Sequence, residues 1–268
     1  MNSKPLILSA LVAGMITTPL YAGPASKFAA HVNSAGEGMH LLHSGNATAT
    51  VSGVPVESSL TDDKLLHATI KTPNKKDLLI GVSLQSGLYT DTTVKGKNGS
   101  SEQAGAEAAI KVEILIDGQM GLAAPDTVIF ARRVQELTAT LGGVIEKCDV
   151  NVDPETGEGE IIIARDCEVS DEEIGLMIST TSANHFNFVA PNMEPGDHTV
   201  DVRVTAMSAA EFNNGEYCAE WDDNGNCISW VETTDNEASA WAIVNLGSLT
   251  VEEVRGTNSP DNVVIELN

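Results

Sequence analysis

The sequence predicts an all-β protein, an antiparallel β-sandwich with disulfide-stapled hairpin loops. Alternation of apolar and polar residues with period two recurs from about residue 47 to the end of the chain. Clusters rich in Gly, Asn, Pro and Ser separate the alternating segments. The four cysteines form two pairs in sequence, and each pair brackets a polar, turn-rich loop. No segment of about 12 or more residues shows the helical period.

The N-terminus has the pattern of a secretory signal peptide. Residues 1–22 contain one lysine, Lys4, followed by an uncharged apolar run from Leu6 to Leu20. This run is shorter than the roughly 20 apolar residues that a membrane span needs. Cleavage is expected after Ala22, with Ala25 as the second choice. The protein is therefore expected to be secreted, whether extracellular, periplasmic or at the cell surface, without membrane insertion.

Two segments follow the expected signal peptide. Residues 23–59 are rich in small residues and are interpreted as an N-terminal arm or an edge strand. Residues 60–268 are interpreted as the β-sandwich domain, because β-sandwiches of about 200 to 250 residues commonly form one domain.

The charge limits the class of partner. The formal net charge is −23 at pH 7, and the loss of Lys4 with the signal peptide makes it −24. Nucleic acids and anionic lipids bind to clustered Lys and Arg, so a nucleic-acid partner is not expected. An acidic surface of this kind suits a soluble protein in salt or in calcium-containing surroundings.

The strands are predicted from alternation. The clearest segments are 47–52, 109–117 and 198–207, where β-branched or small apolar residues alternate with polar ones. Further strands are expected at 65–71, 78–84, 127–140, 159–165, 173–179, 185–190, 238–250 and 262–267. Short strands of this number, separated by turns, favour a sandwich. The cluster at 95–105 is expected to be a mobile loop.

One stretch resembles immunoglobulin-like and fibronectin-like sandwiches. Between Phe186 and Ala206 a strand leads into a Pro/Gly turn, after which Gly196, His198, Val200 and Val202 are spaced as at the E-to-F corner of such domains. The resemblance covers about twenty residues and implies a fold but no function. It places His198 where these domains often carry a corner Tyr. Both an immunoglobulin-like and a jelly-roll-like sandwich remain open.

The cysteines are expected to pair sequentially, as Cys148 with Cys167 and Cys218 with Cys227. An even number of cysteines in an exported chain predicts disulfides. Each pair encloses a turn-rich loop whose ends the flanking strands bring together. Closing a loop of about 20 residues contributes about 3 kcal/mol in the chain-entropy model.

The loop between Cys148 and Cys167 is a candidate calcium site. Asp149, Asn151 and Asp153 have the 1, 3, 5 spacing of calcium ligands, and Glu155 and Glu160 follow, Glu160 at position 12. Position 6, where an EF-hand loop needs Gly, is Pro154, so the loop is not an EF-hand. The alternative interpretation is a solvated acidic hairpin held by its disulfide.

The second cysteine loop is a candidate ligand-contact site. Tyr217, Trp221 and Trp230 flank its turn beside carboxylates and amides. Aromatic faces stack on sugar rings and anchor protein interfaces, so this patch suits a glycan or a protein. The alternative is that both indoles pack over the disulfide and the sheet edge.

Enzyme signatures are missing from the sequence: it has no HExxH, GxSxG or P-loop motif. We therefore expect no catalytic residues, and the leading hypothesis is an exported, non-catalytic β-sandwich that acts by binding or by structure at or outside the cell surface. It would adhere to a glycan or a protein, and calcium would stabilise it. One alternative is a self-assembling filament or surface-layer subunit, in which residues 23–59 add to a neighbour's sheet. Another is a secreted hydrolase with carboxylate chemistry.

Overall fold

The computed structural model describes residues 27–33, 42–43, 47–149, 151–152, 156, 159–160, 167–222 and 226–254. Across these residues the chain consists of strands, turns and loops, without a helix and hence without one that could span a membrane. The body of the molecule is built from long strands: β4 (Val56–Thr72), β5 (Lys76–Gly96), β6 (Ser100–Ile116), β7 (Thr127–Leu141), β12 (Glu172–Met193), β13 (Gly196–Asn213) and β16 (Glu237–Val254). Shorter strands complete it: β1 (Phe28–Asn33), β2 (Leu42–His43), β3 (Ala47–Ala49), β8 (Val144–Cys148), β9 (Asn151–Val152), β10 (Gly159–Glu160), β11 (Cys167–Ser170), β14 (Glu216–Trp221) and β15 (Cys227–Glu232).

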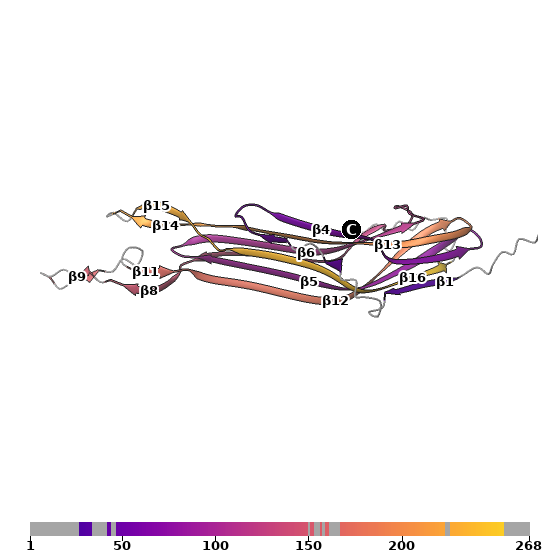
Figure 1. The fold of residues 1–268 in the computed structure, drawn as a ribbon, viewed down its shortest axis with the longest axis horizontal. Coiled ribbons are helices and arrows are strands. Elements are labelled where there is room, and N and C mark those ends of the chain that lie inside the picture. Colours follow the sequence, from indigo (N-terminus) through magenta and orange to yellow (C-terminus); the bar gives the residue numbers. More distant parts are fainter. Residues whose placement is uncertain are drawn as a thin grey trace, which may run out of the picture.

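Two antiparallel sheets form an elongated sandwich (Figure 1). Sheet A has the strand order β1-β16-β5-β12, and β2 and β3 also pair with β16. Sheet B has the order β4-β13-β6-β7. Inward-facing residues of both sheets alternate with exposed ones, as along β5 and β13. The predicted all-β antiparallel sandwich is therefore confirmed.

The N-terminal segment lies along sheet A. Residues 28–33 pair with residues 247–252 of β16, and residues 47–49 pair with residues 238–240 of the same strand. Parts of the segment 23–59, which was considered above for pairing with a neighbour, thus pair with their own chain's sheet. The expected cleavage sites, most of the strand at 159–165 and the strand at 262–267 lie outside the described residues.

The strands are much longer than expected. The predicted strands at 173–179 and 185–190 are one continuous strand, β12, of 22 residues, and β5 has 21. Typical strands have about 5 or 6 residues. At about 3.3 Å per residue, β12 extends over roughly 70 Å. The shape of the sandwich follows from these lengths.

The prediction of a mobile loop at 95–105 is wrong. Only a tight turn separates β5 from β6, and the N–H of Ser100 donates to the carbonyl of Lys97 over 3.0 Å. The two central residues, Asn98 and Gly99, have φ of 53° and 80°, the positive values that a type I′ hairpin turn requires. Such a turn matches the twist of the strands, so pairing continues directly into β6.

The topology agrees with the immunoglobulin pattern at its centre and differs at its ends. When the seven long strands are numbered one to seven in chain order, the long strands of sheet A have the order 7-2-5 and those of sheet B the order 1-6-3-4. Immunoglobulin domains pair two with five and three with six, but place one beside two and seven beside six. Here the first and last long strands, β4 and β16, have exchanged sheets, and the fourth, β7, lies beside β6 and not beside β12. As a result β16 lies inside sheet A, where the N-terminal strands cover its outer side.

The core is aliphatic, in keeping with an aromatic content of only 4% in the sequence. The main cluster lies between the sheets and is built from Leu, Ile, Val and Ala, with Phe188 as its largest fully buried side chain. A second, smaller cluster lies around Val94, Leu141 and Phe212. Between them the inner face of β5 is polar, and Gln135 from β7 bonds across to Thr90 and Thr92 over 2.8 and 2.7 Å.

The corner between β12 and β13 is held by His198. Its Nδ1 lies 2.8 Å from Asp117 Oδ2, and its Nε2 donates to the carbonyl of Glu194 over 2.7 Å. The second bond corresponds to the one that a corner Tyr makes to the backbone a few residues upstream. Burial alone would lower the pKa of His198, but the bonds to Asp117 and Glu194 and the charge of Asp117 together raise it. Burial would raise the pKa of Asp117, but bonds from His198 and Thr199 lower it.

We expect the corner to make stability depend on pH. The raised pKa of His198 means that its contribution is complete below about pH 6.5, its ordinary value, and is lost as the pH rises through the raised pKa. His198→Gln should therefore destabilise the protein by about 1 to 2 kcal/mol at pH 6 and by less at pH 9. Urea unfolding at both pH values measures this. Exposed His185, changed to Gln, is the control, and an equal loss for His198→Gln at both pH values would contradict the pairing.

Candidate functional site

Two disulfide-stapled hairpins extend from the same end of the sandwich, which we call the hairpin end (Figure 1). One is formed by β8 and β11, and the other by β14 and β15. The disulfides Cys148–Cys167 and Cys218–Cys227 close them, so the predicted sequential pairing is confirmed. The described part of the chain has no free cysteine.

Lys97 connects the bases of the two hairpins. It is the first residue of the β5–β6 turn, and its Nζ lies 4.8 Å from the centre of the Tyr217 ring on β14. The same Nζ lies 3.4 Å from Asp171 Oδ1, directly after β11. Next to it, the Asn98 side chain donates to the carbonyl of Cys218 over 3.4 Å. One turn of the sandwich thus contacts both hairpins through cation–π, ionic and hydrogen-bonding interactions.

A buried carboxylate fixes the base of the β14–β15 hairpin. Glu102, on β6, has no exposed surface, and its carboxylate accepts hydrogen bonds from the Gly215 N–H, the Asn236 amide and the Thr233 hydroxyl over 2.7 to 2.9 Å. We call these four residues the Glu102 hub. Asn236 also accepts from the N–H of Lys95 over 2.7 Å, which links the hub to β5.

Gly215 allows the chain to pass close to this carboxylate. A Cβ at this position would lie 2.4 Å from the carbonyl oxygen of Ser101 and 2.7 Å from Glu102 Oε1. Only glycine fits so near to both groups. The hub therefore contacts the chain at the point where it enters the β14–β15 hairpin.

The three aromatic candidates have different surroundings. Trp230 on β15 is 61% exposed. Tyr217 and Trp221 on β14 are partly buried, Tyr217 under Lys97. The indole nitrogen of Trp221 is buried with no hydrogen-bond partner among the described residues. Trp230 therefore presents the free aromatic surface, and the other two belong mainly to the base of the hairpin.

The calcium candidates are only partly described. Asp149 follows β8, is exposed and lies 3.4 Å from Lys147 Nζ. Asn151 and Glu160 are direct partners in the β9–β10 ladder, whereas Asp153 and Glu155 lie outside the described residues. Among the residues that are described, no group of three or more His, Cys, Asp or Glu is placed to hold a metal ion. Calcium binding by this loop stays a prediction.

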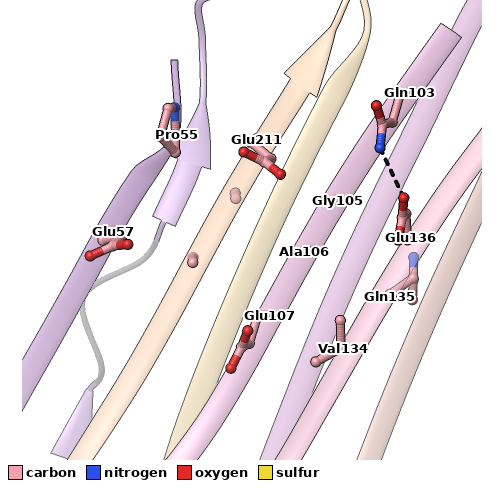
Figure 2. A pocket seen from close by; sticks show the side chains of 12 residues that line it. Pro55, Glu57, Gln103, Gly105, Ala106, Glu107, Val134, Gln135, Glu136 and Glu211 are labelled. Carbon is pink, nitrogen blue, oxygen red and sulfur yellow. Dashed lines mark hydrogen bonds between the residues drawn. The ribbon is translucent and has the colours of Figure 1, made fainter. Parts of the chain in front are cut away.

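A shallow groove of about 310 Å³ lies on the outer face of sheet B (Figure 2). Its floor includes Gly105 and Ala106, and four glutamates project around it: Glu57, Glu107, Glu136 and Glu211. Arg132 binds Glu107 through two bonds of 2.7 and 3.2 Å, and Gln103 donates to Glu136 over 2.9 Å. Two of the carboxylates are thus already engaged, and we assign no acid–base pair to the groove.

No protein-family model matches the chain, and no curated protein matches it significantly. The site is therefore argued from its own geometry.

The sequence located the two hairpins but not the residues that hold them. Lys97 and Glu102 stand in the segment that resembled a loop, and they contact residues more than a hundred positions later. The Asn98-Gly99 dipeptide is a hairpin-turn signal and could have indicated that β5 and β6 pair. No pattern in the sequence distinguishes the buried Glu102 from the many exposed acids.

Proposed function

We propose that the protein is an exported, non-catalytic β-sandwich that binds a glycan or a protein at or outside the cell surface through its hairpin end. The observation that supports this most is the exposed Trp230 on a hairpin whose base is anchored in the sandwich by the Glu102 hub. A large exposed indole next to polar groups is a typical anchor for sugar rings and protein surfaces.

The rigidity of the hairpin end favours binding. Ordering a loop when a partner binds costs free energy, and a hairpin that is already closed by a disulfide avoids part of that cost. The Cys218–Cys227 bridge closes one hairpin and the Cys148–Cys167 bridge the other, while Lys97 contacts the bases of both. A partner would therefore meet two hairpins whose bases are already fixed to the sandwich.

The disulfides also support export. Two disulfides indicate an oxidising, extracellular setting, since cytosolic thiols are normally kept reduced. The proposed signal peptide at 1–22 would deliver the chain there. Fractionating cells that express the complete chain tests this: we expect the protein outside the cytoplasm, shortened by about 22 residues.

Trp230→Ala is expected to weaken binding strongly while leaving the fold unchanged. Co-sedimentation of the mature protein with intact producing cells and with insoluble polysaccharides would measure it. Loss of a central aromatic anchor typically costs 2 kcal/mol or more, so we expect affinity to fall at least about 30-fold.

Trp241→Ala is the matched control for Trp230→Ala. Trp241 is also an exposed indole, 43% accessible, but it lies within β16 and stacks on Tyr89 at 5.2 Å, away from the hairpins. Its replacement should leave binding within about twofold of the original. Equal losses for both variants would contradict a contact site at the hairpin end.

We further propose that calcium stabilises the acidic loop. A ligand that binds only the folded state at a hundredfold excess over Kd stabilises it by about 2.7 kcal/mol, so the midpoint of thermal unfolding should rise by several degrees in calcium relative to a chelator. Replacing Asp149 and Asp153 together by Ala should abolish this rise. An identical midpoint with and without calcium would leave the loop as an acidic hairpin closed by its disulfide.

A further inference from the structure

The outer edge of β12 has almost no strand partner among the described residues. β12 is the last strand of sheet A and pairs only with β5. On its other side the described chain contributes a single bridge, in which Ala124 bonds Val189 in both directions over 2.7 and 3.1 Å. From Glu172 to Phe188 no described strand pairs with this side.

The bridge shows which backbone groups face outward. Both the N–H and the C=O of Val189 point away from β5, because both bond Ala124. In an antiparallel ladder the direction alternates from residue to residue, and the register of β12 on β5 is unbroken from Glu172 to Ala190. The odd-numbered residues from Gly175 to Asn187 therefore direct their hydrogen-bonding groups outward.

Other long edges of the sandwich are protected and this one is not. On sheet B, the edge strands β4 and β7 carry charged residues along their length, and each has a register shift in mid-strand. Charges and bulges of this kind are the usual means of preventing edge-to-edge pairing. In β12 the segment from Ile174 to Met193 contains no Asp, Glu, Lys or Arg.

The same strand exposes an apolar row. Ile174, Leu176, Ile178 and Phe186 lie on the face of β12 that points toward sheet B, yet each remains 37% to 41% exposed. The edge strand of sheet B that faces this part of β12 is β7, and it covers these side chains only in part. Its contacts with β12 include a hydrogen bond from Gln135 to the carbonyl of Leu176 and one from Arg133 to Thr180. A strand added beside β12 would bury these side chains further.

We propose that β12 pairs with β12 of a second copy, antiparallel and about a two-fold axis at Thr181. The residues of the strand argue for this occupant, because a two-fold axis at Thr181 places apolar Leu176 and Phe186 of the two copies opposite one another. Two copies that each carry −23 repel one another elsewhere, but β12 offers a long contact with no acid in its centre. The outward side of Val189 is already bonded to Ala124 of its own chain, so the ladder with a second copy ends at Asn187 in one strand and at Gly175 in the other, and Glu172 and Glu173 lie outside it.

The same register pairs apolar residues. Positions equally distant from Thr181 become opposite, which joins Leu176 to Phe186 in both halves of the contact. Gly175 to Asn187 would form the outward hydrogen bonds, a ladder of 13 residues and roughly 43 Å. Such an isologous contact joins sheet A of both copies into one continuous sheet and closes at two copies.

This proposal does not depend on the function of the hairpin end, because the edge is made by different residues. Sedimentation velocity of the mature, oxidised protein from micromolar to millimolar concentration should show a monomer–dimer equilibrium. Added salt should strengthen the dimer, since it screens the repulsion between two acidic molecules.

Comparing Thr181→Lys with Thr138→Lys separates an effect at the β12 edge from the effect of a change in net charge. Both threonines are exposed on edge strands, Thr181 on β12 and Thr138 on β7, and both changes add one positive charge. At the two-fold axis two lysines would face each other, and like charges directly opposite are destabilising. We expect Thr181→Lys to weaken dimerisation at least tenfold. Thr138→Lys should leave it unchanged or strengthen it.

A covalent test fixes the register. Thr181→Cys would place two thiols opposite one another at the axis, and mild oxidation should give a covalent dimer that Thr138→Cys does not give. A protein that stays monomeric at all concentrations would overturn the proposal. So would oligomers that Thr181→Lys leaves intact but that disappear when residues 261–268 are deleted, because a terminal segment would then be the occupant of the edge.

Discussion

Glu102→Ala is expected to destabilise the protein by about 3 to 5 kcal/mol. The change removes the acceptor for the Gly215 N–H, the Asn236 amide and the Thr233 hydroxyl in a place closed to solvent. A buried donor without a partner costs about 1 to 3 kcal/mol, and the costs of neighbouring donors do not add fully. Urea unfolding, followed by far-UV circular dichroism, measures the change in the free energy of unfolding.

Glu136→Ala is the control for this experiment. Glu136 is an exposed glutamate on the neighbouring strand and accepts one hydrogen bond from Gln103. Its loss should change the free energy of unfolding by no more than about 0.5 kcal/mol. If the two variants are equally stable, the Glu102 hub does not anchor the hairpin, and the β14–β15 hairpin would have to be oriented by its disulfide alone.

Phe188→Ala should have an effect of similar size for a different reason. Phe188 is fully buried in the main core, so truncation removes apolar contacts and leaves a cavity. Phe→Ala changes in cores typically cost about 3 to 5 kcal/mol. Thermal and urea unfolding of the same samples give the value.

The neighbouring phenylalanine provides the comparison. Phe186 lies two residues earlier on the same strand, with its ring centre 5.0 Å from that of Phe188, but it is 38% exposed. Phe186→Ala should cost clearly less, under about 2 kcal/mol, since part of its surface is already in water. A larger loss of stability for Phe186→Ala than for Phe188→Ala would mean that the exposed side chains of β12 are covered in solution. Dimerisation through β12 would be one cause, and the dependence of both values on protein concentration would reveal it.

The alternation of apolar and polar residues predicted the positions of strands better than their lengths. In β13 the inward positions are mostly Val and Ala, and the strand predicted at 198–207 lies within it. In β5 the inward positions include Ser86, Thr90 and Thr92, which are buried but polar. The hydrophobic signal therefore ends near residue 84 although the strand continues to Gly96.

Of the candidate site, only the two disulfides could be predicted from the sequence. The sequential disulfides followed from the spacing of the cysteines, because each pair encloses a local hairpin. The anchoring contacts of Lys97 and Glu102 are long-range, and they depend on which face of β6 meets the strand ends near Gly215 and Thr233. A single sequence carries no signal for such an approach, and acids are so frequent in this chain that one buried Glu does not stand out.

The most direct test of the account is hydrogen–deuterium exchange of the mature, oxidised protein, free and bound to the cell-surface material that retains it. If the hairpin end is the contact site, binding should slow exchange at residues 216–221 and 227–232, around Trp230, with a smaller effect on β8 and β11. Protection confined to the faces or edges of the two sheets, with the hairpins unchanged, would contradict a binding function for the hairpin end.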